Sequence, residues 1–150
     1  MNSSRGYLII IGGAEDKKGD SVILKQAPEM LSDSDTLTVL TTATEKPEET
    51  GRDYYEVFRR LGVKNIQILN INTRDDAGKE ENCRMIENSR GLFMTGGDQL
   101  RITSILGGTR AYQEIKKMYE SGGIIMGTSA GASVMSSTMI VQGNDNEPAR

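Results

Sequence analysis

Five short apolar runs, separated by longer stretches with helical periodicity, constrain the fold of this chain more than any other feature of its sequence. The runs cover residues 7–11, 37–42, 66–71, 92–94 and 124–126. They are rich in β-branched and other apolar residues, which is typical of strands that are buried on both faces of a sheet. The stretches between them are long enough to be helical crossovers, which join parallel strands. The pattern therefore predicts an α/β fold with a parallel sheet and helices on both faces.

The connecting stretches carry helix signals. Pro47 opens one helix, acidic residues follow in its first turn, and Gly62 ends it. After Thr73 we expect a charged helix that continues through Ile86. Further helices are expected after Asp20 and at residues 100–106 and 111–119. Another is expected to follow residues 127–131 and to continue through Val134, and residues 139–141 could form a sixth strand.

Composition limits the possible functions. With 150 residues, the chain can form one domain with its own core. Its net charge of −3 comes from mixed charges without a basic block, which argues against nucleic acid as a partner. No apolar run reaches the roughly 18 residues of a membrane span, and the polar N-terminus lacks the apolar core of a signal peptide. The single cysteine, Cys83, fits a reducing cytoplasm, where we expect the protein to act.

Residues 127–131 (GTSAG) carry the sharpest local signal. They match the G-x-S-x-G nucleophile elbow, and they lie where this motif requires, between a predicted strand and a predicted helix. The small neighbours let strand and helix approach each other, so the Ser129 hydroxyl projects above the edge of the sheet. The backbone N–H of Ala130 then points toward a developing oxyanion. The alternative is a glycine-rich turn without chemistry, but the position after an apolar strand favours Ser129 as a nucleophile.

A second glycine motif, residues 95–99 (TGGDQ), follows the fourth run. In open α/β sheets, ligands bind beyond the carboxyl ends of the strands, and paired glycines there expose backbone N–H groups. Gly97, with Gly96, is therefore a candidate second oxyanion donor, and Gln99 is a candidate contact for a peptide-like substrate. The alternative is an ordinary turn into a helix capped by Asp98.

Residues 12–16 (GGAED), after the first run, form a third glycine-containing motif. They lack the lysine and spacing of a phosphate-binding loop and the third glycine of a dinucleotide fingerprint. Nucleotide binding is therefore not expected. The sequence also lacks histidine and any Cys/His cluster, so neither a histidine-dependent triad within these residues nor a structural zinc site is expected.

Three segments, residues 9–16, 93–99 and 127–132, occur in an order that resembles the cyanophycinases. These are serine peptidases related to the aspartyl dipeptidases, with a flavodoxin-like fold similar to class I glutamine amidotransferases. The resemblance implies hydrolysis of cyanophycin, a poly-aspartate carrying isopeptide-linked arginine, to β-aspartyl-arginine dipeptides. It implies no metal or organic cofactor, and it implies a homodimer. For the site it implies Ser129 as the nucleophile, Gly97 and Ala130 at the oxyanion, and substrate contacts from Gln99, Asp98 and Gly96.

The family's histidine base, its acidic partner and several substrate-binding arginines belong to a segment with no counterpart in these residues. We therefore expect residues 1–150 to be the N-terminal, nucleophile-bearing part of a single α/β hydrolytic domain, incomplete at its C-terminus. A missing C-terminal segment or a second chain would complete the site. Two alternatives stay open: an aspartyl or isoaspartyl dipeptidase, which shares the elbow, and a catalytically dead binding module that keeps the pocket without the base.

Overall fold

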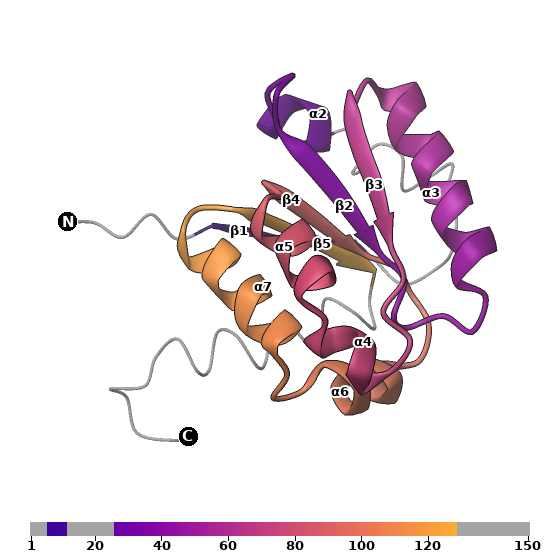
Figure 1. Cartoon of the computed structure of the whole chain (residues 1–150). Helices are drawn as coiled ribbons and strands as arrows, with labels where there is room; N and C mark the ends of the chain where they lie inside the picture. Colours follow the sequence, from indigo (N-terminus) through magenta and orange to yellow (C-terminus); the bar gives the residue numbers. More distant parts are fainter. Residues whose placement is uncertain (1–5, 12–25, 129–150) are drawn as a thin grey trace.

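The structure of the protein is a computed structural model, and it describes residues 6–11 and 26–128. It contains a five-stranded sheet in the order β1-β5-β4-β2-β3 (Figure 1). Every pair of neighbouring strands is parallel. The sheet therefore confirms the predicted α/β class. Its strands are β1 (Tyr7–Ile11), β2 (Thr36–Leu40), β3 (Asn65–Leu69), β4 (Gly91–Met94) and β5 (Ile124–Thr128).

Helices cover both faces of this sheet, with α3 on one face and α5 and α7 on the other (Figure 1). Alternate residues of β4 show the two core layers. Leu92 packs in the same core cluster as Ile115 of α7, whereas Phe93 lies against Tyr54 and Phe58 of α3, with ring centroids 4.6 and 5.2 Å away. The described helices are α2 (Gln26–Met30), α3 (Pro47–Leu61), α4 (Arg74–Gly78), α5 (Glu80–Glu87), α6 (Gln99–Leu106) and α7 (Arg110–Glu120).

The ends of α3 follow the local signals in the sequence. Pro47 is its first residue, and Glu48 and Glu49 lie in its first turn, where the helix dipole favours negative charge. Gly62 follows its last residue with a left-handed φ of 105°, and its N–H bonds to the Arg59 carbonyl. A glycine adopts this conformation without steric cost, so it ends the helix efficiently.

The charged segment after Thr73 forms two helices, so the prediction of a continuous helix through Ile86 is wrong. Helix α4 ends at Gly78, and α5 starts at Glu80 after Lys79, whose backbone is extended with ψ 134°. Glycine is a weak helix former, which favours a break at this point. The break lets Ala77 and Cys83 both be buried, although a straight helix would place them on different faces.

Three predicted elements lie outside the described residues. They are the first turns of the helix after Asp20, the elbow helix through Val134, and the sixth strand at residues 139–141.

Candidate active site

The strand order places the strands that lead into the three glycine motifs next to one another. Strand β5 lies between β1 and β4, and Gly127 is in register with Ile10 on one side and with Met94 on the other. Because the strands are parallel, the carboxyl ends of β1, β4 and β5 lie at the same edge of the sheet (Figure 1). This is the edge at which open α/β sheets bind ligands.

The described part of the elbow ends at the residue before the predicted nucleophile. Strand β5 runs through Thr128, so Ser129 directly follows a strand that is flanked on both sides. Ser129 and Ala130 themselves lie outside the described residues, as do residues 12–16. Of the predicted site residues, the structure therefore describes Gly96, Gly97, Asp98 and Gln99.

Gly97 occupies a position that only glycine tolerates. Its φ is 146°, and a Cβ built on it would lie 2.2 Å from the Ala43 carbonyl oxygen. The next N–H, that of Asp98, donates to the same oxygen at 2.9 Å. The loop after β4 therefore lies directly over residue 43, which follows β2. The loop is exposed at Gly97, so its backbone is accessible to a ligand.

Asp98 and Gln99 begin α6. The Asp98 Oδ1 accepts a hydrogen bond from the Leu100 N–H at 2.9 Å, so Asp98 is the N-cap of this helix. Gln99, the first helical residue, is exposed at the same edge. Asp98 therefore has the helix-capping role that was the alternative interpretation of this motif. Substrate contacts from Asp98, Gln99 and Gly96 stay predictions.

Arg101 is a residue of this region that the sequence analysis missed. Its Nε donates to the Thr42 carbonyl at 3.1 Å, and its side chain is partly buried. The residue lies in the first turn of α6, where the positive end of the helix dipole disfavours a cation. That unfavourable position is the sequence signal that could have identified it.

One thiol lies among the described residues. Cys83 is buried in α5, and this burial raises the pKa of its thiol, so the residue stays protonated and unreactive. No group of His, Cys, Asp or Glu side chains within residues 6–11 and 26–128 is arranged to hold a metal ion. In the same part of the chain, no helix has the length and apolar character needed to cross a membrane.

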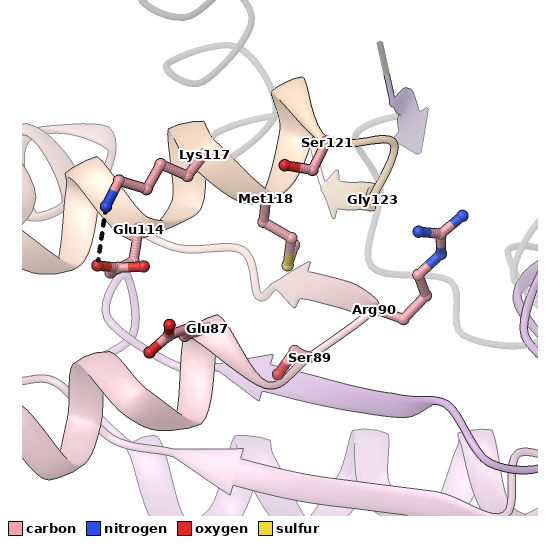
Figure 2. A pocket seen from close by; sticks show the side chains of 8 residues that line it. All are labelled: Glu87, Ser89, Arg90, Glu114, Lys117, Met118, Ser121 and Gly123. Atoms are coloured by element: carbon pink, nitrogen blue, oxygen red, sulfur yellow. Dashed lines mark ion pairs between the residues drawn. The ribbon is translucent and has the colours of Figure 1, made fainter. Parts of the chain in front are cut away.

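A hollow of about 280 Å³ lies at the opposite edge of the sheet (Figure 2). It includes Arg90 and Gly123, the residues that precede β4 and β5. Figure 2 shows the Glu114–Lys117 ion pair of α7 on one wall, with an N···O distance of 3.7 Å. Because it lies at the amino ends of the strands, this hollow is separate from the glycine loops.

The parallel sheet, its strand order and the Gly96-Gly97 loop at its carboxyl edge define an α/β protein of the flavodoxin-like, class I glutamine amidotransferase-like type. A peptidase from an acI-B1 Actinobacterium shares this fold, with a TM-score of 0.70 and 24% identity over 88% of this chain and 57% of that one. The chain belongs to peptidase family S51, whose model matches residues 8–150.

Curated relatives in this family carry the name cyanophycinase. The protein of that name from Synechococcus elongatus is 38% identical over 145 residues, which cover 95% of this chain and 45% of that protein. The one from Trichormus variabilis is 33% identical over 147 residues, covering 97% of this chain and 49% of that protein. The chain therefore spans about half the length of the curated relatives it matches.

Proposed function

We propose that residues 1–150 are the N-terminal, nucleophile-bearing part of a single α/β hydrolytic domain that acts as a serine-type exopeptidase on cyanophycin. The observation that carries this proposal is the strand order, since β5, which leads into Ser129, lies beside β4, which leads into the Gly96-Gly97 loop. Membership of family S51 and the cyanophycinase relatives support the substrate class. The products would be β-aspartyl-arginine dipeptides.

The proposed mechanism assigns one role to each group. The Ser129 hydroxyl attacks a backbone carbonyl of the poly-aspartate chain, and a base takes its proton. The N–H groups of Gly97 and Ala130 stabilise the oxyanion. The C–N bond then breaks, the amine leaves with a proton, and water hydrolyses the acyl-enzyme. Gln99, Asp98 and Gly96 would contact the substrate.

The base must come from outside residues 1–150 in this proposal, because these residues contain no histidine. A neutral serine hydroxyl is a poor nucleophile without an adjacent base. A C-terminal segment or a second chain would supply the histidine and its acidic partner. We further propose that the assembled enzyme is a cytoplasmic homodimer.

The test is dipeptide release from insoluble cyanophycin by the full-length enzyme and its Ser129→Ala variant. We expect the variant to lose nearly all activity, by a factor on the order of 10⁴ or more. Ser34→Ala is the matched control, because Ser34 is exposed in the turn before β2 and remote from the carboxyl edge. Undiminished hydrolysis by Ser129→Ala would refute the proposal.

Two alternative functions can be separated with the same preparations. An aspartyl or isoaspartyl dipeptidase would hydrolyse short aspartyl dipeptides faster than cyanophycin. A catalytically dead binding module would bind the polymer without turnover, and its Ser129 would not react with a fluorophosphonate probe. We expect labelling of Ser129 and preference for the polymer.

A further inference from the structure

Two hydrogen bonds of different kinds join the Gly97 loop and the first turn of α6 to the segment after β2. One joins main-chain atoms, the Asp98 N–H and the Ala43 carbonyl, at 2.9 Å. The other joins the Arg101 side chain to the neighbouring Thr42 carbonyl, with an Nε···O distance of 3.1 Å. The position of Gly97 therefore depends on where residues 42 and 43 lie, and a side chain fixes one of them.

The position of Arg101 is costly for the protein. A cation in the first turn of a helix opposes the helix dipole, and ordering a long side chain costs conformational entropy. The residue is also partly withdrawn from water. A charged donor to a carbonyl forms one of the stronger hydrogen bonds, which offsets part of these costs and fixes the Thr42 carbonyl.

We propose that Arg101 is a positioning residue for the oxyanion donor. Its guanidinium fixes the Thr42 carbonyl, the attached Ala43 carbonyl then fixes the loop, and the Gly97 N–H is held where the oxyanion forms. This inference rests on the proposed function, because it needs Gly97 to be an oxyanion donor. It adds a residue that touches neither the substrate nor the reacting atoms.

We expect loss of the Arg101 side chain to change kcat more than KM. Loss of one oxyanion donor lowers kcat by about 10²–10³-fold, and a displaced donor loses part of this contribution. The proposed substrate contacts Gly96, Asp98 and Gln99 flank Gly97, so a shift of the loop also raises KM. The change in KM is smaller than the change in kcat, because the bond from the Gly97 N–H strengthens only when the oxyanion forms. We expect Arg101→Ala to lower kcat on cyanophycin by about 10–100-fold, and added methylguanidinium to restore part of it.

Arg74→Ala is the matched control for this experiment. Arg74 is an exposed arginine on α4, and its Nη1 donates to the Ser104 carbonyl of α6 at 2.9 Å. Arg74→Ala removes another hydrogen bond from an arginine to a carbonyl that involves α6, at a position away from the Gly97 loop. We expect Arg74→Ala to change kcat by less than about 3-fold, with a similar shift of melting temperature in both variants.

The experiment uses the full-length enzyme, with kcat, KM and Tm measured for each variant. Unchanged kcat in Arg101→Ala, or equal losses in the Arg101 and Arg74 variants that follow Tm, would overturn the inference. If Arg101→Ala does not fold, Arg101→Lys carries the same comparison, since lysine keeps the charge but lacks the Nε–H geometry. Absence of Ser129-dependent hydrolysis in the unmodified enzyme would instead refute the proposed function itself.

Discussion

At the scale of single residues, the proposed oxyanion site depends on the backbone of Gly97. An alanine there would place its Cβ 2.2 Å from the Ala43 carbonyl oxygen, so the loop would have to move. We expect Gly97→Ala to lower kcat on cyanophycin by about 100-fold or more, because the displaced N–H no longer meets the oxyanion. Urea unfolding should show a loss of roughly 1–3 kcal/mol in the free energy of unfolding.

Gly62→Ala separates this effect from ordinary backbone strain. Gly62 also has a left-handed φ, of 105°, but no atom among the described residues lies within 4 Å of the position its Cβ would take. It should reduce the free energy of unfolding while kcat stays the same. Equal stability losses in both variants with no change in kcat would remove Gly97 from the proposed site.

The residues of the candidate site differ in how visible they are in the sequence. Gly97 and Ser129 belong to contiguous motifs whose chemistry requires small neighbours, so the chain identifies them locally. Arg101 acts on a carbonyl 59 positions earlier, in the turn after β2. Its place in the first turn of α6 is a local signal, but the identity of its partner depends on where α6 begins relative to that turn, which is a tertiary feature.

At the scale of elements, Asp98 has two roles at the start of α6. It caps the helix, and it is a proposed substrate contact. Asp98→Ala removes the cap of the Leu100 N–H and should lower the free energy of unfolding by about 1 kcal/mol. Asp98→Asn keeps a capping oxygen, so we expect it to keep stability but lower kcat/KM through loss of the carboxylate. Chemical unfolding and steady-state kinetics on cyanophycin give both quantities.

Thr109→Ala provides the control for a cap without a proposed contact. Thr109 caps α7, and its Oγ1 accepts from the Tyr112 N–H at 3.3 Å. Thr109→Ala should lower the free energy of unfolding by about as much as Asp98→Ala does, and it should leave kcat/KM unaltered. An Asp98→Asn variant that behaves like the unmodified enzyme would reduce Asp98 to a helix cap.

Element types and most element boundaries follow from the sequence, because apolar runs, caps and glycine ends are local signals. The division between α4 and α5 does not, because charged residues on both sides of Gly78 continue a helical pattern. What decides it is the burial of Ala77 and Cys83 in one core, which is a tertiary constraint.

At the scale of the whole molecule, the sheet order makes neighbours of the strands that lead into the three motifs. The sequence predicts parallel strands and therefore a shared carboxyl edge, but it does not say which strands are neighbours. Strand β5, the last described strand, pairs with β1, the first, on one side and with β4 on the other. These non-local pairings arise from burial of both sheet faces rather than from any local preference.

We propose that residues 1–150 supply the nucleophile and the oxyanion donors but not the base. The most direct test is dipeptide release from cyanophycin by purified residues 1–150, shown to be folded by circular dichroism, with and without the histidine-containing remainder of the enzyme. We predict negligible turnover by the isolated chain, and restored hydrolysis, abolished by Ser129→Ala, when the remainder is supplied. Robust turnover by residues 1–150 alone that Ser129→Ala abolishes would contradict the claim and would indicate a lysine or carboxylate base within them.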